Sequence, residues 1–230
     1  MHLLAEIPFA SVELRWYSPL AGAASIRARQ LRGAIAQAFP DDNRFHQHDA
    51  EGKPLYRYPH IQYRWKAGYG VVAGWISGAE ILLNVLWLDL PLTLGKEQVL
   101  VSDAIMSTQY AQFGISKHLL HYRLVSPLLL FNQENYSKYK KLSSDITQQY
   151  ERDRLLVAQL LTAMRGLNVN FGMQLYAAFT HIETIQCRYK NQTMLGIKGD
   201  FVSNALLPSG LAIGHAVSHG YGWIEPVIQL

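Results

Sequence analysis

The segment from Gly210 to Gly222 holds the densest set of residues suited to contact with a phosphate. It carries four glycines and two histidines within thirteen residues, in the order GLAIGHAVSHGYG. Glycine permits positive φ and close backbone approach, so such a loop exposes N–H groups against which a phosphate can lie without a Cβ clash. The segment lacks the Gly-Lys-Ser/Thr ending of a Walker loop. It therefore predicts a phosphate-binding loop or, alternatively, a tight connection between two strands.

A second candidate is the pair His46 and His48, which lies in a polar stretch over residues 40–54. Histidine exchanges protons readily near neutral pH because its unperturbed pKa is about 6.5. If the stretch is extended, residues two apart point to the same side. Two alternatives stay open. The pair, with acidic neighbours such as Asp49, could ligate a divalent ion, or it could belong to a solvated surface loop.

The elements that precede these histidines show clear periodicity. Apolar and polar residues alternate over residues 3–16, which predicts a strand, and an apolar face at three- and four-residue spacing predicts a helix over 23–39 that Pro40 ends. The polar stretch is predicted to be a loop. Three further strands are expected in this half, over residues 56–65, 70–76 and 80–90.

The second half repeats this order. A strand over residues 122–131 is followed by a helix over 145–165, for which Gly166 is the expected C-terminal cap. Further strands are expected over residues 173–189, 192–207 and 223–228. Two copies of a strand–helix–strands unit predict an α+β chain of two ferredoxin-like domains in tandem, over residues 1–115 and 116–230, with the glycine-rich loop in the second.

Composition excludes several classes of protein. Hydrophobic residues make up 49% and charged residues 17% of the 230 residues, which excludes intrinsic disorder as the main state. The longest apolar runs are far shorter than the ~18 residues of a membrane-spanning helix, so no membrane association is expected. The N-terminus does not have the pattern of a secretory signal, and the single cysteine, Cys187, agrees with a reducing compartment. The expected location is the cytoplasm.

Charge is divided unevenly along the chain. Residues 1–115 carry 10 basic and 10 acidic side chains, whereas residues 116–230 carry 11 basic and 7 acidic ones. The net charge of +4 in the second half favours a polyanionic partner, although an ordinary basic surface accounts for it equally well.

Several motifs together resemble the CRISPR-associated endoribonucleases of the RAMP superfamily that process repeat RNA. The most specific is GLAIGHAVSHGYG, which follows the segment LGIKGDF over residues 195–201. In the first half, LRGA at residues 31–34, the HQH of residues 46–48 and YPHIQYR at residues 58–64 are similar to a histidine-containing branch of that family. The resemblance implies two RRM-like ferredoxin folds and cleavage of CRISPR precursor RNA within repeats to give mature guide RNAs, with no metal and no cofactor.

In this family the ribose 2′-hydroxyl attacks the adjacent phosphate, which requires a base, an acid and a group that stabilises negative charge. The resemblance places His46 and His48 in the proton-transfer roles. Tyr56 and Tyr58 are candidates to position the hydroxyl, and Arg29 or Arg32 would supply the cation.

The expected RNA contacts come from the second half of the chain. Lys198 fits the family motif, and the glycine-rich loop would contribute Gly210, Gly214, His215, Ser218, His219, Gly220 and Gly222. A Lys/Tyr stretch adds Lys138, Lys140 and Lys141. The resemblance names CRISPR repeat RNA as the partner, and it points to other CRISPR-associated interference proteins and to a homodimer.

Two other functions remain open. A catalytically inactive RAMP-type RNA-binding subunit of an interference complex would share the fold, the loop and the charge. An unrelated metal-dependent hydrolase would use the His-x-His pair and the nearby acidic residues.

Overall fold

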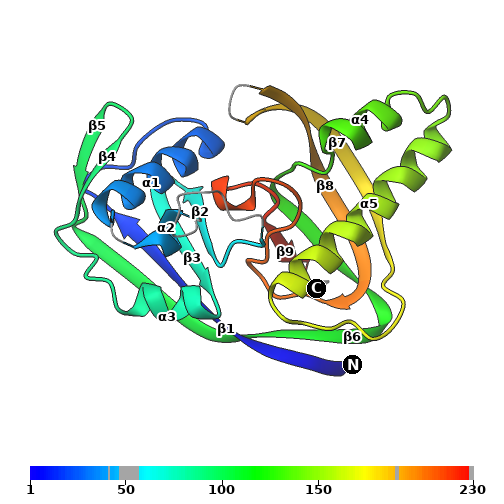
Figure 1. Ribbon diagram of the computed structural model, residues 1–230, viewed down its shortest axis with the longest axis horizontal. Coiled ribbons are helices and arrows are strands. Elements are labelled where there is room, and N and C mark those ends of the chain that lie inside the picture. The colour runs from blue at the N-terminus through cyan, green and yellow to red at the C-terminus, as the bar shows by residue number, and fades with distance from the viewer. Residues whose placement is uncertain (41, 47–56, 190–191, 228–230) are drawn as a thin grey trace. The chain divides into compact units, whose positions relative to one another are not determined.

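The computed structural model describes residues 1–40, 42–46, 57–189 and 192–227 (Figure 1). The chain divides into two compact units. The N-terminal unit comprises residues 7–110 and 218–220, and the C-terminal unit comprises residues 1–6, 111–217 and 221–230. No helix within the described ranges is long and apolar enough to cross a membrane.

The N-terminal unit contains helices packed on an antiparallel sheet in which β3 pairs with both β1 and β2. Its elements are β1 (His2–Arg15), α1 (Ala24–Ala38), α2 (Asn43–His46), β2 (Ile61–Lys66), β3 (Tyr69–Trp75), α3 (Ser77–Leu83), β4 (Pro91–Leu94), β5 (Glu97–Leu100) and the first part of β6 (Asp103–Leu128). The first residues of β1 belong to the C-terminal unit.

The core of the N-terminal unit explains why α1 forms where the sequence predicts it. Leu31 and Ile35 are fully buried and join Val12 and Leu14 of β1 in one apolar cluster. Strand alternation and helical spacing therefore present matching apolar faces. The predicted strand over residues 3–16 and the predicted helix over 23–39 are confirmed, with ends that differ by at most two residues.

The predicted strand over residues 80–90 is wrong. Residues 77–83 form α3, whose buried residues are Gly78, Ala79, Ile81 and Leu82. A short apolar run does not distinguish a buried strand from a buried helix. The glycines at positions 74 and 78 decide the packing, because a Cβ on Gly74 would collide with the backbone carbonyl of Gly78. Only glycine lets α3 lie this close to β3.

The C-terminal unit carries α4 and α5 against β7 and β8. Its elements are the second part of β6, α4 (Gln133–Tyr139), α5 (Asp145–Gly166), β7 (Ala177–Tyr189), β8 (Gln192–Leu206) and β9 (Ile224–Pro226), and a 3-10 turn (Val217–His219) leads into the N-terminal unit. β8 pairs antiparallel with β6 and β7, and β9 pairs with β6.

Helix α5 follows the prediction, with two differences. Ser144 caps its start, since the Ser144 hydroxyl accepts a hydrogen bond from the Thr147 amide at 3.2 Å. The buried residues of α5 begin only at Leu155, whereas Ile146 and Tyr150 in the first two turns are exposed. The expected cap at Gly166 is wrong, because Gly166 is still helical and the left-handed residue is Asn168, with φ of 60°.

Candidate active site

Helix α1 presents two arginines three residues apart, outside its buried stripe. Arg29 is exposed and Arg32 is half-buried. Residues at this spacing share one side of a helix. The structure thus distinguishes the two candidates for the cation: Arg32 is held against the protein, while Arg29 extends into solvent.

Arg32 is held by the glycine-rich segment. Its Nη1 lies 2.7 Å from Nε2 of His219, and Nδ1 of His219 lies 3.2 Å from the hydroxyl oxygen of Ser218. A guanidinium can only donate, so Nε2 accepts and the proton of the neutral ring is on Nδ1, which donates to Ser218. This arrangement fixes the tautomer of His219.

Gly220 allows the glycine-rich segment to approach α1. Its φ is 85°, and a Cβ at this position would lie 2.8 Å from Cβ of Ala28 and 3.2 Å from the carbonyl oxygen of Tyr63. A side chain here would meet both steric conflict and backbone strain. Residues 218–220 therefore pack against α1 and β2 and belong to the N-terminal unit.

Tyr63 of β2 ties the end of α2 to the same region. Its buried hydroxyl donates a hydrogen bond to the carbonyl oxygen of Phe45 at 3.3 Å. Burial raises the pKa of Tyr63 well above its usual range, while the charge of Arg32 opposes this shift. Tyr63 therefore remains a neutral donor at physiological pH. Because His46 follows Phe45, this bond positions the backbone next to one predicted catalytic histidine.

The predicted loop over residues 40–54 is wrong over residues 43–46, which form the short helix α2 with His46 as its last residue. The short helix forms because Phe45 is buried and stacks on Phe39, with the ring centroids 5.1 Å apart. The His46 side chain, His48 and Tyr56 lie outside the described parts of the structure. Tyr58 is half-buried in the segment that leads into β2.

Two arginines that the sequence analysis missed lie near these residues. Arg44 and Arg57 line a cavity of about 40 Å³ together with His60 and Ser77. Nδ1 of His60 lies 3.3 Å from the Ser77 hydroxyl, and Arg44 forms an ion pair with Asp42 at 2.6 Å. The available signal was adjacency, since Arg44 precedes His46 by two residues and Arg57 lies between the two candidate tyrosines.

Three glycines of the glycine-rich segment lie in the C-terminal unit, and two of them are closely packed. Gly210, Gly214 and Gly222 all have positive φ. A Cβ on Gly214 would collide with the Leu128 side chain, and one on Gly222 would collide with the Ile213 carbonyl. The segment is thus a tight connection, the alternative that the sequence left open, and its RNA contacts stay a prediction.

His215 lies in the same connection. Its amide donates to the Leu129 carbonyl at 2.9 Å, and its ring Nε2 is buried with no hydrogen-bond partner among the described residues. Burial lowers the pKa of His215 below its usual value. The half-buried ring therefore favours the neutral form.

The predicted lysines lie on two elements of the C-terminal unit. Lys198 is exposed on β8 and pairs in register with Glu183 of β7. On α4, Lys138 forms an ion pair with Glu134 at 2.6 Å, and Nζ of Lys140 lies 5.5 Å from the ring centroid of Tyr136. The exposed Lys141 follows the helix.

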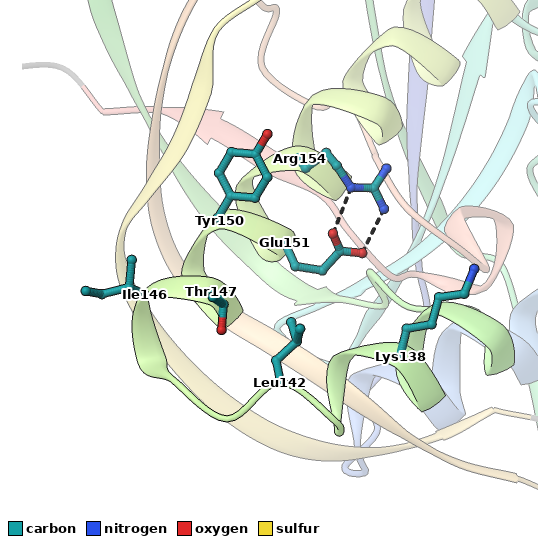
Figure 2. Close-up of a pocket in the computed structure, with 7 residues that line it drawn as sticks. All are labelled: Lys138, Leu142, Ile146, Thr147, Tyr150, Glu151 and Arg154. Carbon is teal, nitrogen blue, oxygen red and sulfur yellow. Dashed lines mark hydrogen bonds and ion pairs between the residues drawn. The ribbon is translucent and has the colours of Figure 1, made fainter.

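A shallow groove of about 660 Å³ runs between α4 and α5 (Figure 2). Its lining is mostly apolar, and the Glu151 carboxylate in it is paired with Arg154 at 2.7 Å. Lys138 comes from α4 and Arg154 from α5 (Figure 2). The groove contains no histidine among its described lining residues.

Two family models match consecutive parts of the chain. The model of the Cas6b N-terminal domain matches residues 7–112, and that of the Cas6b C-terminal domain matches residues 114–227. The chain belongs to the Cas6b family. This result confirms the resemblance seen in the sequence, while the expected domain boundary at residue 115 stays a prediction.

Solved structures of Cas6 proteins share the fold. A crystal structure of Cas6b has a TM-score of 0.86 at 22% identity, covering 96% of this chain and 100% of the other. A second, described as a CRISPR RNA processing endoribonuclease Cas6b, has a TM-score of 0.68 with the same identity and coverage. A Cas6 product complex has a TM-score of 0.57 at 13% identity, covering 96% of this chain and 99% of the other. These likenesses confirm the predicted α+β fold with two ferredoxin-like domains.

One curated relative is also found. An uncharacterised protein of Methanocaldococcus jannaschii is 29% identical over 143 residues, which is 62% of this chain and 94% of the relative.

A metal site in this Cas6b chain would need several ligating side chains close together. Within residues 1–40, 42–46, 57–189 and 192–227, no three His, Cys, Asp or Glu side chains lie close enough together to hold a metal ion. The His-x-His pair that would carry such a site lies partly outside these ranges.

Proposed function

We propose that this Cas6b chain is a metal-independent endoribonuclease that cleaves CRISPR precursor RNA within its repeats and so releases mature guide RNAs. The observation that carries the proposal is the hydrogen bond between Arg32 and His219. It assembles a cation and an imidazole beside the end of α2, where the predicted catalytic pair begins. CRISPR repeat RNA is the proposed substrate.

The proposed reaction is an internal displacement at phosphorus. The 2′-oxygen of the nucleotide before the cut forms a bond to the phosphorus, and the bond from phosphorus to the 5′-oxygen breaks. The products are a 2′,3′-cyclic phosphate and a 5′-hydroxyl. One imidazole of His46 and His48 removes the proton from the 2′-hydroxyl, and the other gives a proton to the leaving 5′-oxygen.

Arg32 is assigned the stabilisation of charge on the phosphate oxygens. A guanidinium presents several donors in a planar fork that matches two phosphate oxygens. Its Nη1 is already oriented by His219, so less side-chain freedom is lost when RNA binds. Arg29, exposed one turn earlier on α1, is assigned an outer contact with the RNA backbone.

Two tyrosines are assigned positioning roles. Tyr63 holds the end of α2 through the carbonyl of Phe45, and so it acts on catalysis only through His46. Tyr58, together with Tyr56, is proposed to orient the attacking hydroxyl by hydrogen bonding.

The test is cleavage of the CRISPR repeat RNA from the organism that encodes the chain, in buffer containing EDTA. We expect one cut by the wild-type protein and a loss of roughly 10²–10⁴-fold in rate for His46→Ala/His48→Ala. A matched control is His118→Ala/His181→Ala, which removes two exposed histidines of the C-terminal unit. Loss of wild-type cleavage in EDTA would contradict the metal-free mechanism. Binding without any cut would instead indicate an inactive RNA-binding subunit.

A further inference from the structure

A second pocket lies wholly within the C-terminal unit, between the start of α4 and the start of β8. Its volume is about 330 Å³, at the lower end of the ~300–1,000 Å³ typical of small-molecule sites. The lining residues are Phe131, Asn132, Gln133, Tyr136, Gln192, Thr193, Met194 and Leu195. We propose that this pocket binds one unpaired nucleobase of the RNA.

The inner surface of the pocket suits the flat face of a base. Phe131 is 3% exposed and Tyr136 is 36% exposed, and their ring centroids lie 5.9 Å apart at an interplanar angle of 54°. The half-buried Met194 and Leu195 add apolar and polarisable contact. Unstacked bases in RNA are commonly bound by stacking on such aromatic rings.

The rim of the pocket suits the polar edge of a base. Gln133 and Gln192 are exposed, and each amide group carries both hydrogen-bond donors and an acceptor. A Watson–Crick edge also presents donors and acceptors side by side, so an amide can pair with it. Asn132 also caps the start of α4, since its Oδ1 accepts a hydrogen bond from the Asn135 amide at 2.7 Å.

The charge around the pocket suits a nucleotide. None of the described residues that line it is acidic. Nζ of Lys140 lies over the Tyr136 ring, 5.5 Å from its centroid, so an ammonium group stands beside the aromatic surface of the pocket and is available to a nucleotide phosphate. The exposed Lys141 follows directly. Aromatic, amide and ammonium groups therefore converge on one site from two elements.

The substrate class is an unpaired nucleotide, because a base inside a duplex offers neither face to a protein side chain. This proposal rests on the proposed function in one respect, which is that the bound RNA is CRISPR repeat RNA. It predicts that the pocket contributes affinity and base preference rather than chemistry, since none of its described lining residues is a histidine.

The first test compares Tyr136→Ala and Tyr136→Phe with the wild-type protein. We expect Tyr136→Ala to weaken binding of the repeat RNA by roughly 5- to 150-fold, as loss of one stacking contact does. Tyr136→Phe retains the ring and should bind normally. The control is Tyr176→Ala, at a tyrosine that is 52% exposed in the same unit. Equal affinity of Tyr136→Ala and the wild type would overturn the proposal.

The second test needs no cleavage. With [¹³C]methyl-labelled methionine, the Met194 signal should shift on titration with unstructured RNA hexamers, and the exposed Met173 should serve as the reference. Hexamers of different single bases should differ in affinity, and Gln133→Ala/Gln192→Ala should reduce that difference. An unchanged Met194 signal at saturation would overturn the pocket proposal. A shifted Met194 signal in a protein that neither binds nor cuts repeat RNA would overturn the proposed function alone.

Discussion

The guanidinium of Arg32 donates a hydrogen bond to Nε2 of His219 across 2.7 Å, although the two residues are 187 positions apart in the chain. The bond joins helix α1 to a segment contributed by the C-terminal half of the sequence. Since Nδ1 of His219 is in turn within 3.2 Å of the Ser218 hydroxyl, the ring is restrained at both nitrogens. Arg32 is therefore a preorganised cation, whereas Arg29 on the same helix is exposed.

Arg32→Ala is predicted to slow cleavage far more than Arg29→Ala. Removal of a donor that stabilises developing charge typically costs about 10²–10³-fold in rate. Arg29 is assigned an outer contact, so its removal should mainly weaken RNA binding. It should also make that binding less dependent on salt concentration, because one phosphate fewer is neutralised. Single-turnover rates at saturating protein distinguish these effects. Equal rates for the two variants would contradict the assignment.

Arg32 and His219 are predicted to act as one unit. If His219 orients Arg32, the effect of His219→Ala on cleavage should largely disappear in the background of Arg32→Ala. A double-mutant cycle on the single-turnover rate should give a coupling energy within the ~0.5–3 kcal/mol found for residues in contact. Additive effects would show that His219 acts independently, for example through its own contact with RNA.

Glycine substitutions on the two sides of this contact are predicted to have opposite effects. Gly33 lies in the interior of α1, and a Cβ there would meet open space, so Gly33→Ala should raise the free energy of unfolding by about 0.5–1 kcal/mol. Gly220→Ala should lower it by at least about 1–2 kcal/mol, because an L side chain is strained at φ of 85° and would also press on Ala28. Denaturant titration measures both values. A stabilising Gly220→Ala would contradict the described approach of residues 218–220 to α1.

The sequence predicted those parts of the fold that local periodicity determines. Helix α1 is predictable because Leu31 and Ile35 recur at helical spacing before Pro40. Strand β1 is predictable because its apolar and polar side chains alternate. Helix α3 could not be predicted from the pattern of apolar residues, since its packing depends on the close approach of Gly74 and Gly78. The short α2 was missed as well, because it is stabilised by the burial of Phe45 against Phe39 rather than by local propensity.

The candidate site was predictable by residue type but not by geometry. The sequence named both arginines and His219, yet it placed His219 with the RNA contacts and left open which arginine faces the site. That choice depends on a contact between segments far apart in the chain, which no spacing rule encodes. The cavity with Arg44 and Arg57 was missed for a similar reason, since its residues come from α2, from the segment before β2 and, through Ser77, from α3.

Gly214→Val is predicted to lower the stability of the fold, rather than to act directly on RNA binding. Its φ is 90°, and a Cβ would collide with Leu128 while lying 2.8 Å from the Leu129 carbonyl oxygen. A β-branched residue adds further steric conflict, so we expect a loss of roughly 1–3 kcal/mol or more in the free energy of unfolding. The midpoint of urea unfolding gives this loss directly. Normal stability combined with weakened RNA binding would instead support a phosphate-binding role for this glycine.

His215 is predicted to make the stability of the C-terminal unit fall in mild acid. Burial lowers the pKa of its ring in the folded state, and its Nε2 has no hydrogen-bond partner within the described residues. As pH falls below the unfolded value of about 6.5, the unfolded chain binds a proton before the folded chain does. The stabilising contribution of the neutral ring is therefore present above that pH and is lost progressively as pH decreases toward the folded pKa.

The variant His215→Phe should flatten this dependence, because phenylalanine fills a similar space and does not titrate. The free energy of unfolding, measured by urea titration at several pH values between 5 and 7.5, should fall less steeply in the variant than in the wild type. His118→Phe is the matched control, since it makes the same replacement at a histidine that is exposed. Parallel curves for the wild type and His215→Phe would contradict a buried neutral ring. A flattened curve would identify the connection that carries His215 as the acid-sensitive part of this unit.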